Sequence, residues 1–453
     1  MTKLKALFVL ALAVLVSAPA FAETQNVKVS GSIDAYWFYR NNYDLRDGND
    51  TGALPAGTAG TATTQRSEGD DFARTNTQIE VSADLTDNVS TVVNLVNQRD
   101  WNADLYTTGA ANTTEEFDVT LDLAYVQMKE IFYSPLTLTI GRQDIWLGRG
   151  FVIGNNNTAW DPQATTVADE YSVTTAFDAV RATLDFNPWT VDLIYSNINE
   201  NSVNPEDDRE LYVANVNYKF AEYNAVAEGY WITEVDRATV VTAGVTQDNL
   251  TNTLGGRVQF DPIAQITLGG EIATQFGDYF SSSTAVERDR SALGINVFGT
   301  YRLDYTWKPE VTLEYVSFSG DAGTSTTEEF GGWNALYRGH FWTAYADFRE
   351  FVYGTTQTGD QAATSNQNIF QIKGAIKPLE DVSLEGAWSY IWNDESIAGA
   401  SDEIGWEFDF QATYDYTEDV SFGFLAGWFV PGEFYASNDE TATDIVSSVK
   451  VSF

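Results

Sequence analysis

The chain has 453 residues, a formal net charge of −40 and no cysteine. So large an excess of acid argues against nucleic-acid binding, which needs a basic surface. The absence of cysteine excludes disulfides, thiol chemistry and covalent attachment of c-type haem.

Residues 1–22 have the pattern of a secretory signal peptide. Lys3 and Lys5 precede a continuous apolar run over residues 6–16, and Ala20-Phe21-Ala22 forms a cleavage site of the small-x-small type. The run is shorter than the roughly 20 residues that a membrane-spanning helix requires. We therefore expect cleavage after Ala22. The mature chain, residues 23–453, should form one domain, because no linker rich in Pro, Gly or Ser divides it.

Alternating apolar and polar residues predict long β-strands along the mature chain. The first expected strand covers residues 27–40 and the second covers residues 73–85, and the clearest alternation runs from residue 403 to residue 416. One face of these strands is rich in Trp, Tyr and Phe, and the other is polar or charged. Such strands behind an export signal predict an all-β fold, a transmembrane antiparallel up-and-down β-barrel in the bacterial outer membrane.

The connections between the expected strands alternate between short and long. Short turns such as Asp87-Asn88 and Asp261-Pro262 carry residues that favour tight turns, whereas residues 101–117, 150–175 and 277–290 form long polar loops. Short periplasmic turns and long extracellular loops are typical of outer-membrane barrels. The pattern predicts about 20 strands, with 18 as the main alternative. The larger number includes a short turn at residues 338–340, between long loops at residues 320–329 and 354–367.

The last expected strand ends with apolar residues of one parity, finishing at Phe453. A terminal aromatic residue on an alternating strand is similar to the signal that the barrel assembly machinery reads, so we expect that machinery as a partner. The other expected partners are outer-membrane lipid and lipopolysaccharide, which surround any such barrel. The oligomeric state, monomer or trimer, stays open.

Parity also predicts which side chains face the lumen. A Lys or Arg at the lipid midplane costs about 2–4 kcal/mol, so charged residues within strands should point inward. Opposed charges across a lumen hydrate and orient polar solutes, although pairing that merely stiffens the wall is the alternative for any single residue. The pore-lining candidates selected in this way are Arg74, Arg181, Arg257, Arg302, Asp347, Arg349, Glu407 and Asp409.

One expected strand changes phase. Apolar residues occupy even positions up to Ile140 and odd positions from Ile145. This change predicts a β-bulge at Gly141, because a bulge shifts the phase of a strand by one residue. The bulge would turn Arg142 and Asp144 into the pore. The alternative is that the strand leaves the membrane at Gly141 and that the following residues form a loop.

Four motifs between residues 136 and 186 resemble the alginate export family of outer-membrane barrels. They are Gly141-Arg142-Gln143, Gly148-Arg149-Gly150, Trp160 and Phe177-Asp178-Ala179-Val180-Arg181. The resemblance implies a monomeric barrel of 18 strands that is plugged by loops. It also implies an arginine-lined path for an anionic polysaccharide, with Arg142, Arg149 and Arg181 as pore arginines.

The long loop at residues 150–175 is the third along the chain. In general porins the loop at this place folds inward, and a barrel of about 20 strands is wide enough to need such a plug. The alternative is an ordinary external loop. If the loop folds inward, the residues that line the constriction are Asn155, Asn156, Asn157, Asp161, Asp169 and Glu170.

Residues for enzymatic catalysis or for a resident metal are scarce. The only histidine is His340, within a predicted turn, and the chain has no HExxH, GxSxG or phosphate-loop motif. Acidic clusters at residues 44–50 and 206–208 could take up calcium at external loops, but their spacing does not match a known calcium loop. We therefore predict neither an enzyme nor a cofactor.

The sequence favours a channel that passes small polar or charged solutes, anionic ones among them. The lumen would be lined by arginines and acids and narrowed by inward-folded loops. Two alternatives remain at this point: an exporter of polysaccharide like that of the alginate family, and a closed barrel that acts as a scaffold or adhesin.

Overall fold

The computed structural model describes residues 25–42, 45, 70–101, 119–156, 171–199, 208–237, 240–241, 245–246, 248–281, 286–321, 329–339, 365–396, 400–435 and 439–453. The predicted signal peptide lies outside these residues. Within them, no helix has the length and apolar character needed to cross a membrane.

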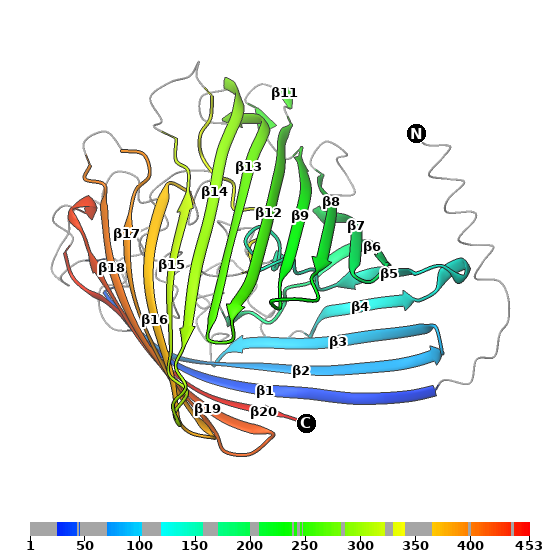
Figure 1. Cartoon of the computed structure of the whole chain (residues 1–453), viewed down its shortest axis with the longest axis horizontal. Coiled ribbons are helices and arrows are strands. Elements are labelled where there is room, and N and C mark those ends of the chain that lie inside the picture. Colours follow the sequence, from blue (N-terminus) through cyan, green and yellow to red (C-terminus); the bar gives the residue numbers. More distant parts are fainter. Residues whose placement is uncertain are drawn as a thin grey trace, which may run out of the picture.

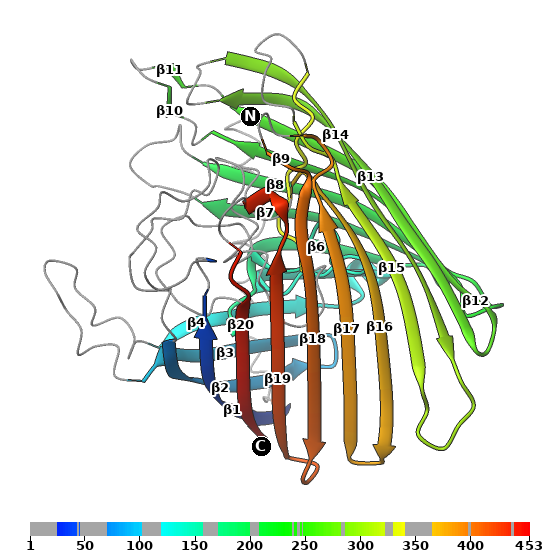
Figure 2. The ribbon, with the colours of Figure 1, turned by 90° about the vertical axis from the view of Figure 1, so that its left-hand side faces the viewer.

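Eighteen antiparallel strands form one closed sheet (Figures 1 and 2). The first strand, β1 (Gln25–Asn41), pairs with the last, β20 (Ala442–Ser452), so the sheet closes on itself. A separate hairpin joins β10 (Val240–Val241) to β11 (Val245–Thr246). The other barrel strands are β2 (Asp70–Thr86), β3 (Val89–Asp100), β4 (Thr120–Met128), β5 (Leu136–Gln143), β6 (Phe177–Asp185), β7 (Trp189–Asn199), β8 (Arg209–Lys219), β9 (Val226–Asp236), β12 (Asn249–Ile263), β13 (Ile266–Ser281), β14 (Val286–Arg302), β15 (Glu310–Phe318), β16 (Gln367–Leu379), β17 (Val382–Trp392), β18 (Glu403–Asp415) and β19 (Val420–Pro431).

Short turns gather at one end of the barrel, where the carboxyl terminus also lies (Figure 2). The longer connections leave the opposite end, as the sequence predicts. One expected long loop is mostly strand: β13 and β14 extend through residues 277–290 and leave only residues 282–285 between them. Apolar side chains such as Trp37, Leu254 and Ile272 are exposed on the outer wall, which fits a surface that faces lipid.

The barrel has eighteen strands rather than about twenty, and residues 329–339, expected to supply a further strand and its turn, lie inside the barrel instead. The connection from β15 to β16 covers residues 319–366, so Arg338 and Gly339 are not in a periplasmic turn. His340 lies outside the described residues. Trp333 and Tyr337 share one parity, as residues on one face of a strand would. They and Phe330 are nevertheless fully buried on the side of the lumen and do not face lipid.

Two segments fold into the lumen and form an apolar core there. The first inward segment is residues 144–156, between β5 and β6, and the second inward segment is residues 329–339. The Phe151 ring lies 5.4 Å from the Phe318 ring and 5.7 Å from the Trp333 ring. Burial of large apolar side chains contributes roughly 1.5–3 kcal/mol each, so this core holds both segments within the barrel.

The strand register is continuous where the sequence predicts a bulge. β5 pairs with β4 and with β6 without a shift through Gly141, although Gly141 itself has a φ of 120°. The predicted bulge at Gly141 is therefore wrong. β5 ends at Gln143, and the apolar phase changes because Ile145 and Leu147 pack into the lumen core.

The seam of the barrel depends on a glycine opposite the carboxyl terminus. The Gly31 N–H donates to the Phe453 carbonyl at 2.9 Å, and the Phe453 N–H donates back to the Gly31 carbonyl at 3.0 Å. A Cβ on Gly31 would lie 2.5 Å from the Gln78 carbonyl oxygen and 2.8 Å from the Phe453 ring. Only glycine allows so close an approach without a shift of the backbone.

We expect Gly31→Ala to lower the folded fraction of the barrel, because overpacking of this kind costs about 1–3 kcal/mol. The measurement is the fraction that keeps the compact, fast-migrating form in unheated gel electrophoresis. Gly386→Ala is the matched control, since its Cβ would lie at an ordinary 3.7 Å from the nearest atom. Equal folded fractions for the two variants would contradict the role of the seam.

Candidate functional site

The two inward segments are hydrogen-bonded to each other across the lumen. The Gly154 N–H donates to the Tyr337 carbonyl at 2.7 Å, and the Tyr337 N–H donates to the Val152 carbonyl at 3.1 Å. The Gly339 N–H donates to the Gly150 carbonyl at 2.8 Å. A Cβ on Gly154 would lie 2.5 Å from the Gly339 Cα, so the close contact requires glycine on both segments. We call this contact the clamp.

Side chains of the wall hold the second inward segment in place. The Tyr337 hydroxyl donates to the Glu234 carboxylate at 2.7 Å. Burial, together with the Glu234 charge, raises the pKa of this hydroxyl well above its usual range, so it keeps its proton. Gln275 donates to the Asn334 carbonyl at 2.7 Å and accepts from the Asn334 N–H at 2.8 Å. These bonds tie the segment to β9 and β13.

A bulge in β4 positions an anchor for the connection that carries the first inward segment. The register between β3 and β4 shifts beside Asn94 and Leu95, and Asp122 is the extra residue. Its buried carboxylate accepts from the Thr175 N–H at 3.1 Å. The Asn156 N–H in turn donates to the Thr175 carbonyl at 3.1 Å. Asp122 therefore fixes the chain where it returns from the lumen to β6.

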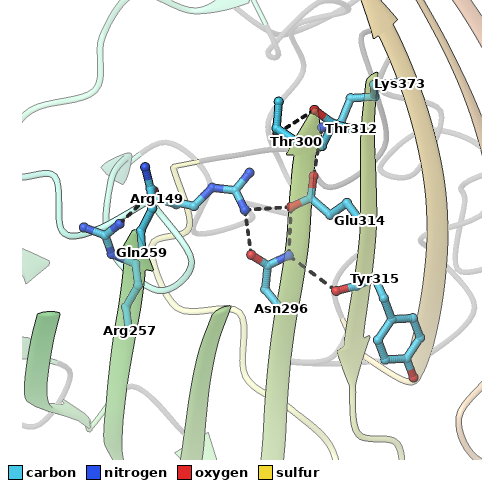
Figure 3. A network of polar contacts seen from close by, with 9 residues as sticks. All are labelled: Arg149, Arg257, Gln259, Asn296, Thr300, Thr312, Glu314, Tyr315 and Lys373. Atoms are coloured by element: carbon cyan, nitrogen blue, oxygen red, sulfur yellow. Dashed lines mark hydrogen bonds and ion pairs between the residues drawn. The ribbon is translucent and has the colours of Figure 1, made fainter. Parts of the chain in front are cut away.

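Arg149 reaches from the first inward segment to the far wall (Figure 3). Its Nη1 donates to the Glu314 carboxylate at 2.8 Å and to the Asn296 side-chain oxygen at 2.7 Å. The guanidinium lies 4.0 Å from the centroid of the Phe298 ring. Lys373 binds the other Glu314 oxygen at 2.9 Å. One buried carboxylate thus serves two cations, supplied by β16 and by the inward segment.

Arg257 stands on the other side of Arg149 in Figure 3. Its Nε donates to the Glu228 carboxylate at 3.1 Å. Gly148 has a φ of 57°, and a Cβ there would lie 3.1 Å from the Arg257 Nε and from Glu228. The Gly148-Arg149-Gly150 turn therefore passes close to the wall between β9 and β12, which brings the two arginines together.

In these ion pairs the cation is more exposed to the lumen than its partner. The Arg149 side chain is 23% exposed and Glu314 is 1% exposed, and Arg181 is 26% exposed against 6% for Asp192. Arg257 and Lys373 are likewise more exposed than their carboxylate partners. The acids lie against the wall and the cations lie in front of them.

The structure places most of the predicted pore residues on the inner face, although their part in solute passage stays a prediction. Arg181 pairs with Asp192 at 2.8 Å, and Arg302 pairs with Glu310 at 2.9 Å near the short turns. Asn155 and Asn156 lie on the first inward segment. Arg74, Arg257, Glu407 and Asp409 also face inward. Outside the described residues lie Asp347, Arg349, Asn157, Trp160, Asp161, Asp169 and Glu170.

Arg142 lies on the outer face, contrary to the prediction. The register pairs it with Asp178, and its Nη1 binds the Asp178 carboxylate at 3.2 Å. Asp178 has the parity of Val180, which is exposed on the outer wall, whereas Phe177 and Ala179 are buried inside. Asp144 follows the end of β5, where its carboxylate accepts from the Thr175 hydroxyl at 3.0 Å. Because no bulge reverses the phase, Arg142 does not turn inward.

The sequence reading missed three members of the network: Asn296, Glu314 and Lys373. The alternation of the strands was enough to place Glu314 and Lys373 on the inner face. Their neighbours Leu313 and Ile372 are exposed on the outer wall, so the adjacent residues face inward. Tyr337 was missed for another reason, since its segment was expected to form a strand.

Comparisons with known proteins agree with this architecture. The alginate export family matches residues 56–447, and the chain belongs to this family. No curated protein gives a significant match. Among solved structures, OccAB1 of Acinetobacter baumannii is similar at a TM-score of 0.58 and 12% identity, covering 97% of this chain and 99% of that chain. OccK11 (OpdR) of Pseudomonas aeruginosa gives 0.55 and 12%, covering 94% and 96%.

A third similar structure is OccK2 (OpdF) of Pseudomonas aeruginosa in complex with glucuronate. It has a TM-score of 0.54 and 12% identity, and the match covers 95% of this chain and 99% of that chain. Identity this low establishes the fold and no more. The family and the fold are those of channel barrels, so the protein is an outer-membrane barrel of that kind.

We expect Gly154→Val to open the clamp, since its side chain cannot fit against Gly339. Single-channel recordings in planar bilayers should then show a larger and noisier current than the unaltered protein. Gly229→Val is the control, because a Cβ there meets nothing closer than 3.9 Å. A folded Gly154→Val barrel with unchanged current would rule out the clamp as a constriction.

Proposed function

We propose that this member of the alginate export family is a channel for small anionic solutes, carboxylated sugars among them. The observation that carries the proposal is the order of charges in the lumen. Arg149, Arg257 and Lys373 stand in front of the buried carboxylates with which they pair.

The chemistry of these groups suits a carboxylate. Guanidinium groups bind carboxylates through two parallel N–H donors, and lysine adds a mobile point charge. Passage also requires that a solute leave again, so binding must stay weak. The carboxylates of Glu228 and Glu314, which pair with the three cations, partly neutralise them. Such a site attracts an anion without trapping it.

The inward segments would set the size limit of the path. The clamp joins them across the lumen, and they share an apolar core, so the proposed path runs along the polar side, where Arg149 meets β14 and β15. The glucuronate complex of the similar barrel names one carboxylated sugar as a ligand of that protein. For the present chain, it suggests the class of solute to test first.

The family match favours a second candidate, the export of an anionic polysaccharide. A polymer requires a wider path than a single sugar, so the inward segments would have to move apart during export. The two candidates therefore differ in whether the clamp opens.

For the first candidate, we expect the double variant Arg149→Gln with Lys373→Gln to lower the anion-to-cation permeability ratio about fivefold. The expectation corresponds to about 1 kcal/mol for loss of partly screened lumen charges. Reversal potentials in a salt gradient give the ratio. The control double variant, Lys129→Gln with Lys308→Gln, removes the same charge outside the strands, near the short turns. An equal shift in both variants, or none in either, refutes the proposed path.

For the second candidate, a disulfide across the clamp is informative, since the chain has no cysteine of its own. Ile153 and Tyr337 are bridge partners, so Ile153→Cys with Tyr337→Cys can be cross-linked. We expect oxidation to leave the small-anion current largely unchanged and reduction to have no further effect. If oxidation instead blocks passage of anionic oligosaccharides that the reduced form transports, the polysaccharide exporter is favoured.

A further inference from the structure

The outer wall of β6 to β9 carries a groove that the channel function does not use. Its volume is about 410 Å³, and its floor includes the small side chains Ala182 and Ala214. Larger side chains, Leu193, Tyr212 and Trp231, form its borders. All five have outward parity, so the groove opens toward the membrane. Its lining is largely apolar, as an acyl chain requires.

The groove lies in the half of the barrel near the long connections. Tyr212 is three residues from Arg209, where β8 starts, and Val180 is three residues from Phe177, where β6 starts. Both strands begin at the end that carries the long connections. With short turns in the periplasm, this half spans the outer leaflet. The lipid beside the groove is therefore an outer-leaflet lipid.

A charged rim borders the groove on the side of the long connections. Glu210 accepts from the Tyr195 hydroxyl at 3.0 Å, from the Tyr212 hydroxyl at 3.2 Å and from the Arg237 Nη1 at 3.0 Å. These three donors occupy a single carboxylate, and the Arg237 side chain is 32% exposed. A guanidinium has five N–H donors, so Arg237 can bind Glu210 and a further acceptor at the same time.

The opposite end of the rim carries Arg142. Its Nε is buried and its Nη1 binds Asp178, but the side chain as a whole is 24% exposed and Asp178 is 65% exposed, so the outer end of this ion pair faces the rim. Arg142 lies on β5 and Arg237 directly follows β9, so four strand spacings separate them. At about 4.8 Å for each spacing, the two arginines are roughly 19 Å apart. A rim of this width suits a large headgroup with more than one anionic group.

We propose that this surface binds lipopolysaccharide, with an acyl chain in the groove and headgroup phosphates at Arg142 and Arg237. The groove alone gives little preference, because lipid tails are as apolar as its lining. Selectivity comes from the arginines, which form charge-assisted hydrogen bonds with phosphate oxygens. The acidic neighbours Asp178 and Glu210 would repel a phosphate if the arginines were absent. The site is separate from the lumen, so the proposed lipid binding does not depend on the proposed channel function.

The test measures bound lipid A on the purified full-length barrel in detergent by native mass spectrometry. Bisphosphorylated lipid A and phosphatidylethanolamine are the two probes. We expect Arg142→Gln with Arg237→Gln to weaken retention of lipid A about tenfold, which is the loss of one or two charged hydrogen bonds. Retention of phosphatidylethanolamine should not change. Ala214→Phe, which fills the groove, should reduce retention of lipid A as well.

Ala412→Phe is the matched control, because it adds the same ring to the outward face of β18. Unheated gel electrophoresis verifies that each variant is folded, and bilayer recordings verify that its current is unchanged. Equal retention of lipid A by the double arginine variant and the unaltered protein would overturn the proposal. So would an equal loss in Ala412→Phe and Ala214→Phe, or equal affinity of the unaltered protein for the two lipids.

Discussion

The need to satisfy backbone hydrogen bonds within lipid governs the whole structure. No water is present there to bond a free N–H or C=O, so strands can cross only as a closed sheet. Closure through the pairing of β1 with β20 meets this need. A closed sheet of eighteen strands encloses more space than its inward side chains fill. The inward segments follow from this excess, since they fill the lumen with a core of their own.

The lumen core explains which parts of the fold could be predicted from the sequence. Alternation located the strands, and charge parity placed Arg74, Arg181 and Arg257 on the inner face. The same rule assumes that apolar residues face lipid, and it fails where a second apolar environment exists. Ile145 and Trp333 pack into the lumen core, so the sequence suggested a bulge and a hairpin that are absent from the described residues.

Bulges also limit what parity can predict. Ile404 continues the clearest alternation in the chain, yet it is buried inside. The register between β17 and β18 shifts next to Gly405, which has a φ of 144°. At Asp122 a bulge in β4 turns the carboxylate toward Thr175, where the connection that carries the first inward segment returns to β6. Each bulge depends on pairing between strands, and a single strand's sequence does not specify which residue its neighbour leaves unpaired.

The charge of the chain illustrates why the site needed a structure. A net charge of −40 suggests a lumen that repels anions. The exposed groups matter more than the total, because a buried carboxylate that accepts two cations presents little negative charge to a solute. Glu314 is such a group, and Arg149 reaches it from a segment 165 residues away in sequence. The motif around Gly148 pointed to Arg149, but its partner and its position in front of the acid follow only from the closed barrel. Charge order in the lumen is thus a property of the fold.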